Sequence, residues 1–267
     1  FAAGEHDYEI TGDGIAVYPR IEALLSQPTA PMALGERLVS TGVAGLDAAL
    51  GGGVLERSAT LVIGPSGAGK TTLGLNFMTG ASPQERSAFF GLVESPEQLL
   101  RKSDQLDLGL RAAAEHGWLG FHWQPTTQFL PDQVALAVID QVREKRLSRI
   151  VIDTLAALTR PCARQRRQLE FTSALVNEVR ALGATMVATW ELSHFPGADP
   201  TAPPAELCSL FDNIVLLDFT EGAGPSEPTL RIIKRRNGAY ERHIHSAQIG
   251  RGGYSTTPTG TPTPQDR

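Results

Sequence analysis

A glycine-rich run at residues 64–71 has the residue types and spacing of a loop that binds a triphosphate. Glycines let such a loop turn its backbone N–H groups inward around phosphate oxygens, and a helix that starts where the loop ends adds partial positive charge. Lys70 is expected to reach the β- and γ-phosphates, and the Thr71 hydroxyl is expected to bind Mg²⁺. The predicted nucleotide contacts are Gly64, Ser66, Gly67, Ala68, Gly69, Lys70, Thr71 and Thr72.

The flanking residues supply the strand and the helix that this loop needs. The apolar run 60–63 predicts a buried strand before the loop, and residues 72–78 predict a helix after it. The alternative, a glycine-rich turn without a ligand, does not account for that order of elements. The sequence therefore predicts a nucleoside triphosphate site, with ATP and Mg²⁺ as the expected ligands.

Two acidic residues that follow apolar runs are candidates for the remaining chemistry. Asp153 ends the run 149–152, and a carboxylate there would hold Mg²⁺ directly or through water. Glu94 follows the run 89–93 and is the candidate to orient or deprotonate an attacking water. Each has a simpler alternative: many α/β strands end in Asp, and a carboxylate at a helix start is favoured by the helix dipole.

Strands and helices alternate beyond the loop at the spacing of a parallel sheet. Strands are predicted at residues 89–93, 119–123, 149–153 and 185–189. Helices are predicted from Ser95-Pro96 onward and over about 131–145 and 168–182. Antiparallel strands are predicted at 213–219, 229–233 and 241–249. This order predicts an α/β fold with a mostly parallel central sheet, flanking helices and antiparallel C-terminal strands.

Two similar β-hairpins are predicted near the ends of the chain. Residues 6–10 and 15–18 flank a Gly-rich turn, and residues 244–249 precede a second such turn. The similarity suggests that residues 1–20 close a preceding unit of the same kind. The predicted organisation is then a hairpin at 1–20, a linker at 21–38, the main domain at 39–254 and a disordered Thr/Pro-rich tail at 255–267.

The bulk composition narrows the class of protein. The chain has 267 residues, 41% of them hydrophobic, which is typical of a globular protein. A net charge of −5 argues against a generally basic nucleic-acid surface. Cys162 and Cys208 are too few and too distant for a disulfide framework or a zinc site. Reduced thiols in a cytoplasmic protein are therefore expected, and no apolar stretch has the length of a membrane span.

Taken together, the motifs resemble the KaiC family of RecA-like ATPases. The residues that carry the resemblance are 40–47, 51–53, 64–71, 93–96, Asp153 and 234–236. The resemblance implies a RecA-like P-loop fold and an ATP-dependent homohexameric ring, with the nucleotide between neighbouring subunits and regulatory proteins as partners. The chain is most similar to the second domain of double-domain members, which in the clock proteins also transfers phosphate to its own Ser and Thr side chains.

The same resemblance assigns two basic residues to a neighbouring subunit's nucleotide. Lys234 and Arg236 would reach across the interface to the γ-phosphate, as an arginine finger does when charge develops in the transition state. An exposed basic edge strand that discourages aggregation is the alternative. Both residues therefore join Lys70 and Glu94 as candidates for catalysis.

Two positions depart from the family pattern. The family usually has adjacent glutamates after the strand at 89–93, whereas here Val93 precedes Glu94. If the missing glutamate is the stronger base, turnover is expected to be slow or absent. In the phosphoacceptor region Ser209 stands at one of two hydroxyl positions and Cys208 at the other. That difference argues against a paired phosphorylation cycle.

Three other groups carry weaker signals. His243 and His245 alternate along a predicted strand, as metal ligands or as part of an exposed strand face. Trp118 and Trp123 bracket another strand and are expected in the core. The basic run at residues 164–167 would line a ring pore, form a subunit contact or lie in a solvated loop; its arginines are Arg164, Arg166 and Arg167.

Two alternatives to an ATPase ring remain open at this point. The first is an ATP-dependent assembly module with little or no hydrolysis, which the valine at position 93 favours. The second is a RecA-like motor that acts on DNA, whose support is confined to the basic run against an acidic background. No membrane partner is expected, and nucleic acid is not the favoured one.

Overall fold

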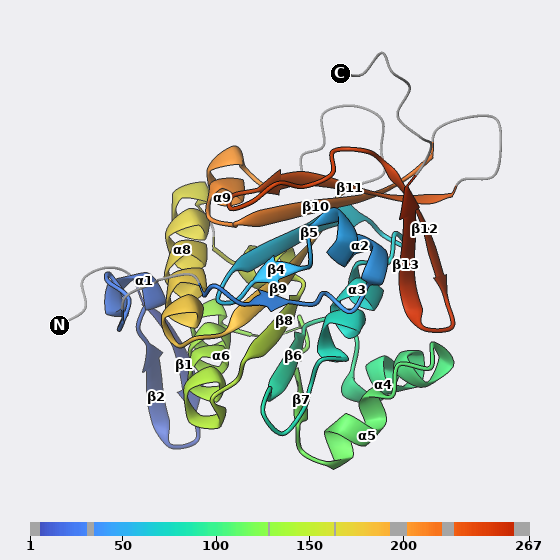
Figure 1. The fold of residues 1–267 in the computed structure, drawn as a ribbon. Coiled ribbons are helices and arrows are strands. Elements are labelled where there is room, and N and C mark those ends of the chain that lie inside the picture. The colour runs from blue at the N-terminus through green and yellow to red at the C-terminus, as the bar shows by residue number, and fades with distance from the viewer. Residues whose placement is uncertain are drawn as a thin grey trace.

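The described part of the chain is built around a nine-stranded sheet with helices on both faces (Figure 1). The structure is a computed structural model, and it describes residues 6–30, 35–127, 129–162, 164–192, 202–220 and 227–258. Its strands are β1 Asp7–Thr11, β2 Gly14–Tyr18, β3 Leu38–Val39, β4 Val54–Leu55, β5 Ala59–Pro65, β6 Ser87–Gly91, β7 Leu119–Trp123, β8 Arg149–Asp153, β9 Thr185–Leu192, β10 Asn213–Phe219, β11 Pro228–Arg235, β12 His245–Gly250 and β13 Gly253–Pro258. Its helices are α1 Ile21–Leu24, α2 Ala44–Ala49, α3 Lys70–Met78, α4 Pro96–Gln105, α5 Leu110–Glu115, α6 Pro131–Lys145, α7 Leu155–Thr159, α8 Gln165–Ala181 and α9 Ala205–Ser209.

The order of strands in the large sheet is β13-β12-β11-β10-β5-β9-β8-β6-β7. Neighbours from β10 through β7 pair in parallel, and the pairs from β10 to β13 are antiparallel. Every residue of β5, β6 and β8 is buried, as expected for parallel strands covered by helices on both faces. The predicted α/β class, with a mostly parallel sheet and antiparallel C-terminal strands, is confirmed.

Apolar side chains form one core layer on each face of this sheet. On one face α6 and α8 bury Ile139, Phe171 and Leu175 (Figure 1). On the other face α3 buries Leu73 and Phe77 against the strands. Because α3 is anchored in the core along its length, the loop between β5 and α3 has a fixed position.

Asn76 ties α3 to the C-terminal hairpin formed by β12 and β13. Its side-chain amide donates to the carbonyls of Gly42 and Gly252, each at 3.1 Å. Its Oδ1 accepts from the Tyr254 N–H at 2.8 Å. The buried amide is therefore satisfied by three backbone groups, which join the helix to two distant segments.

The N-terminal segment forms the hairpin that the sequence predicts. β1 and β2 pair antiparallel as a separate two-stranded sheet, with Ile10 opposite Ile15 and Tyr8 opposite Val17. These four apolar side chains share one face and are exposed. The predicted linker also contains structure, because α1 lies in it and buries Ile21 against α6 and α8.

Several boundaries differ from the prediction. β12 begins at His245 rather than at residue 241, and α8 begins at Gln165. β13 extends to Pro258 and thus into the predicted disordered tail, because its backbone pairs with β12 throughout and Thr256 is buried. Parts of the predicted hairpin segment, linker and tail, at residues 1–5, 31–34 and 259–267, lie outside the described residues.

Both cysteines have free thiols, and neither is paired with the other. Burial raises the pKa of the Cys162 thiol to about 11, which makes it a poor nucleophile at neutral pH. Within the described ranges, no helix is both long enough and apolar enough to cross a bilayer.

Candidate functional site

The glycine-rich loop lies between β5 and α3, as predicted. Gly67 and Gly69 have φ angles of +83° and +93°, a conformation that side chains with a Cβ rarely adopt. A Cβ on Gly69 would also lie 2.7 Å from the ring of Tyr254 and 2.8 Å from Ile249 on the C-terminal hairpin. Glycine is therefore required in the loop both for its turn and for the close approach of β12 and β13.

Lys70, the first residue of α3, points its ammonium into the loop. Its Nζ donates to the carbonyls of Gly64 at 2.8 Å and Pro65 at 2.7 Å. The side chain is only 7% exposed, and burial lowers its pKa, an effect that Glu191 partly opposes. The ammonium is thus held inside the loop by carbonyls that a stronger acceptor, such as a phosphate oxygen, can replace.

Thr71 and Asp153 are brought together although they are distant in sequence. The Thr71 hydroxyl donates to Asp153 Oδ2 at 2.8 Å, and the Thr189 hydroxyl on β9 donates to Oδ1. Asp153 is buried, and burial raises its pKa against the effect of the two hydrogen bonds. A buried carboxylate beside a hydroxyl is a hard-oxygen donor set of the kind that Mg²⁺ uses. The residues present therefore fit this metal.

Glu94 lies at the edge of the same site, between β6 and α4. Its negative charge acts on Asp153 and contributes to the raised pKa of that carboxyl group. Glu94 Oε1 accepts a hydrogen bond from Lys102 Nζ of α4 at 2.7 Å. Val93 beside it is 64% exposed, and its aliphatic side chain adds no second carboxylate at this position.

Glu191 is an acidic residue of this site that the sequence analysis missed. It lies on β9 opposite Gly64 of β5 in the parallel register. Its Oε2 is 4.0 Å from Lys70 Nζ. The predicted strand ended at Thr189, whereas β9 continues to Leu192. A longer predicted strand would have placed the Glu191 carboxylate at its carboxyl end, where Asp153 lies on β8.

Lys234 and Arg236 lie at the opposite end of the strands from the loop. Asn213 pairs with Thr60 on one side and with Arg235 on the other, which places the end of β11 beside the amino-terminal end of β5. Within one chain these two basic residues therefore do not join the site of Lys70.

The two basic side chains instead contact backbone carbonyls around α9. Lys234 Nζ donates to the carbonyls of Phe211 at 2.7 Å and Cys208 at 3.2 Å. Arg236 donates to the carbonyl of Ser209 at 2.7 Å. Burial, followed by the charge of Arg236, lowers the pKa of Lys234. Ser209, whose hydroxyl donates to Glu206 O at 2.6 Å, thus shares one end of the sheet with both cations.

The histidine and tryptophan predictions need correction. His245 is 1% exposed, whereas His243 lies exposed before β12 begins, so the two do not share an exposed strand face. In the described ranges, no group of three His, Cys, Asp or Glu side chains is placed to hold a metal ion. Trp123 is 46% exposed, because it is the last residue of β7, the edge strand of the sheet, and Trp118 is half-buried.

The basic run at residues 164–167 begins a helix rather than lying in a loop, with Arg164 and Arg166 exposed and Arg167 packed against neighbouring helices. It starts α8, and Arg167 contacts Glu22 of α1 at 3.2 Å and the buried carboxylate of Asp132 in α6. Arg166 forms an ion pair with Glu170 one turn along the helix. The alternative of a DNA-acting motor thereby loses part of its sequence support.

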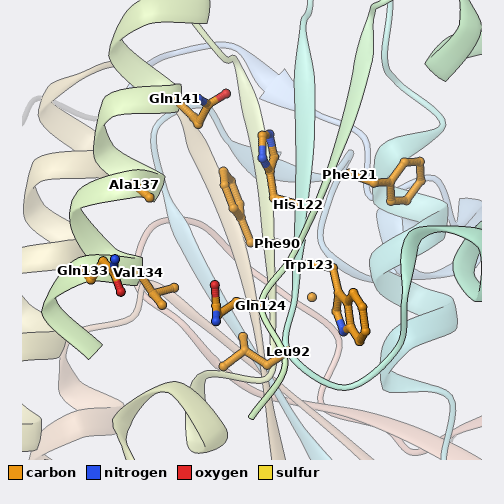
Figure 2. A pocket seen from close by; sticks show the side chains of 11 residues that line it. Phe90, Leu92, Phe121, His122, Trp123, Gln124, Gln133, Val134, Ala137 and Gln141 are labelled. Atoms are coloured by element: carbon orange, nitrogen blue, oxygen red, sulfur yellow. The ribbon is translucent and has the colours of Figure 1, made fainter. Parts of the chain in front are cut away.

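A pocket of about 420 Å³ lies away from the glycine-rich loop, between α6 and strands β6 and β7 (Figure 2). Phe90 and His122 stack along it with ring centroids 4.9 Å apart. Burial, followed by the charge of Lys145, lowers the pKa of His122. None of its lining residues belongs to the loop or to the Thr71–Asp153 contact.

The sheet order, the loop between β5 and α3, and the acid at the end of β8 define a RecA-like P-loop α/β domain. A family model described as "ATPase: KaiC" matches residues 39–260. The chain therefore belongs to the KaiC family of ATPase domains.

Curated relatives agree with this membership. The chain is 27% identical to the circadian clock oscillator protein KaiC of Picosynechococcus sp. and to KaiC 1 of Synechocystis sp., each over 94% of this chain and 47% of the relative. It is 26% identical to the KaiC protein of Synechococcus elongatus, over 92% of this chain and 46% of the relative. The chain thus spans about half the length of the curated relatives it matches.

Proposed function

We propose that this domain binds ATP with Mg²⁺ at residues 64–72 and hydrolyses it within a homo-oligomeric ring. The observation that carries the proposal is the 2.8 Å contact between the Thr71 hydroxyl and Asp153, because it unites the loop with the acid of β8. Lys70 exchanges its two carbonyl acceptors for the β- and γ-phosphates. Thr71 and Asp153 hold Mg²⁺, which neutralises phosphate charge when bound.

In this proposal Glu94 orients the attacking water and accepts its proton. Support comes from the segment that carries it, since the Leu92 N–H donates to Asp153 O at 2.8 Å, and from the effect of the Glu94 charge on Asp153. Phosphate release by the wild type and by Glu94→Gln, with ATP binding measured in parallel, tests this role. A clear loss of turnover with retained binding is expected. Equal rates at background would contradict hydrolysis and leave the assembly module, which Val93 favours.

The ring is proposed because the candidate cations are remote from their own loop. Lys234 and Arg236 lie at the end of the sheet opposite the loop, so in this proposal they serve the nucleotide of a neighbouring subunit. Arg236 is about half exposed and forms a 3.6 Å ion pair with Asp212, and its contact with the Ser209 carbonyl is replaceable by a phosphate. By family resemblance the ring is a hexamer with regulatory protein partners. Its mass in solution with and without ATP tests the assembly; a monomer under both conditions would contradict it.

Autokinase activity is a narrower proposal that rests on Ser209. Its backbone carbonyl contacts Arg236 at 2.7 Å, so the cation proposed to reach a neighbour's γ-phosphate lies beside a candidate acceptor hydroxyl. Intact-mass analysis after incubation with ATP is expected to show one added phosphate in the wild type and none in Ser209→Ala. An unmodified wild type would remove this activity without affecting the ATPase proposal.

We also propose that residues 1–20 close a preceding KaiC-type domain. The two hairpins have the same turn register, with Ile10 opposite Ile15 and Ile249 opposite Tyr254. Both members of the second pair approach Gly69 of the loop, and Tyr254 is buried there, whereas both members of the first pair are exposed. The first pair would therefore cover the equivalent loop of another domain. The double substitution Ile10→Asp and Ile15→Asp is expected to leave the melting temperature of this chain unchanged. In a longer chain that carries a preceding KaiC-type domain, the same double substitution is expected to lower the melting temperature.

A further inference from the structure

We propose, on the basis of the ATPase proposal above, that Lys102 is a positioning residue that restrains Glu94 and slows hydrolysis. The restraint is the ion pair between Lys102 Nζ and Glu94 Oε1 at 2.7 Å. The Lys102 side chain is 34% exposed and the Glu94 side chain is 29% exposed. Water therefore competes with the pair less than it does at an open surface.

The local structure explains why these two residues meet. Glu94 immediately precedes Ser95, whose N–H donates to Gln98 Oε1 at 2.7 Å as part of a capping box, and Pro96 fixes the first turn of α4. Lys102 follows Ser95 by about two helical turns and so lies on the same side of the helix. A long helical side chain extends toward the N-terminus of its helix, which brings the ammonium to the carboxylate of Glu94.

The pair bears directly on the chemistry proposed for Glu94. A carboxylate oxygen that accepts a charge-assisted hydrogen bond from an ammonium is less available to a water. The base must instead contact the attacking water at hydrogen-bond distance. Lys102 also limits the rotamers that the Glu94 side chain can adopt while the pair is formed. The contact is therefore expected to oppose the productive position of Glu94.

Val93 makes this restraint effective. The position before Glu94 carries an exposed aliphatic side chain, so an adjacent carboxylate does not take over while Lys102 holds Glu94. Glu191, the other acid of the site, is directed to Lys70 at 4.0 Å. A single substitution at Lys102 is therefore expected to change the rate through Glu94.

The test compares phosphate release by the full chain and four variants. Lys102→Met removes the pair and is expected to raise kcat about two- to five-fold, the effect of one partly exposed ion pair, with KM unchanged. Lys102→Arg keeps the pair and should behave as the wild type. Arg101→Met removes the same charge from an exposed neighbour on α4 and should also leave the rate unchanged. Lys102→Met combined with Glu94→Gln should abolish the gain.

The outcomes separate this proposal from the one on which it rests. A kcat for Lys102→Met equal to or below that of the wild type, with ATP binding and melting temperature retained, overturns the restraint. If the wild type hydrolyses ATP through Glu94 in that case, the ATPase proposal stands and the role of Lys102 falls. If the wild type and every variant bind ATP and none releases phosphate above background, the ATPase proposal and the role of Lys102 are both wrong. A gain that persists in the double variant also overturns the restraint, because Glu94 would not mediate it.

Discussion

Asp153 shows how one residue links the loop to the rest of the sheet. The Thr71 hydroxyl from α3 and the Thr189 hydroxyl from β9 each donate to one oxygen of its carboxylate. Because the carboxylate is buried, its charge is stabilised only by such nearby groups. A divalent cation would complete that stabilisation, which is why the arrangement favours metal binding.

Removal of the Thr71 hydroxyl is expected to weaken the dependence of ATP binding on Mg²⁺. In Thr71→Val the site loses one oxygen donor and retains Asp153, so affinity measured with Mg²⁺ should fall roughly 10- to 100-fold. The measurement is a titration with ATP in the presence and absence of Mg²⁺. Thr79→Val is the matched control, because Thr79 follows the last residue of α3 and its hydroxyl donates to Asn76 O at 2.7 Å, outside the site. Equal losses in both variants would contradict the role of Thr71.

His245 is expected to make stability depend on pH. Burial lowers its pKa below the ordinary value of 6.5, with a smaller opposing effect of Glu241. The unfolded chain therefore binds a proton more readily, so the free energy of unfolding should decrease as pH falls through 6.5 toward the lower folded pKa. Above 6.5 both states are neutral and the effect is absent.

Chemical denaturation of variants across this pH range checks the expectation. In His245→Gln the free energy of unfolding should no longer show the decrease that His245 causes below pH 6.5. His243→Gln, at an exposed position, should keep that decrease. If the free energy of unfolding depends on pH in the same way in the wild type and in His245→Gln, another group is responsible.

Among the elements, α1, α6 and α8 are joined by an ionic cluster at the base of the N-terminal hairpin. Arg167 of α8 contacts Glu22 of α1 and Asp132 of α6, and Asp132 Oδ1 also accepts from the Ile21 N–H at 3.1 Å. Asp132 is fully buried, and burial raises its pKa. The cluster therefore fixes where the segment after the hairpin joins the domain.

Loss of the Arg167 charge is expected to destabilise the domain strongly. Arg167→Met leaves the buried carboxylate of Asp132 without its cation, which should lower the free energy of unfolding by about 3 kcal/mol. Arg166→Met is the matched control, since its side chain is 87% exposed and its ion pair with Glu170 is at the surface. Denaturant unfolding of both variants measures the difference. A loss in Arg167→Met no greater than in Arg166→Met would refute the role of the cluster.

At the scale of the molecule, local sequence patterns predicted the frame of the site and missed several of its partners. The loop at 64–71 and the strand that ends at Asp153 were correct because turn chemistry and apolar periodicity are local signals. The contact of Thr71 with Asp153, the burial of His245 and the ionic contacts of Arg167 depend on segments that meet only in the folded chain. Glu191 was missed because the end of β9 was placed too early.

The distance between the loop and the cations of β11 leads to a prediction about the assembled ring. If Arg236 serves a neighbour's nucleotide, subunits with Lys70→Ala and subunits with Arg236→Ala should each be inactive alone and complement each other when mixed. The complementing interface pairs the intact loop of one subunit with the intact Arg236 of the other. Random assortment around a ring makes about a quarter of the interfaces competent. Phosphate release by the mixture should therefore recover to about that fraction of the wild-type rate, whereas a cation acting on its own subunit's nucleotide would give no recovery.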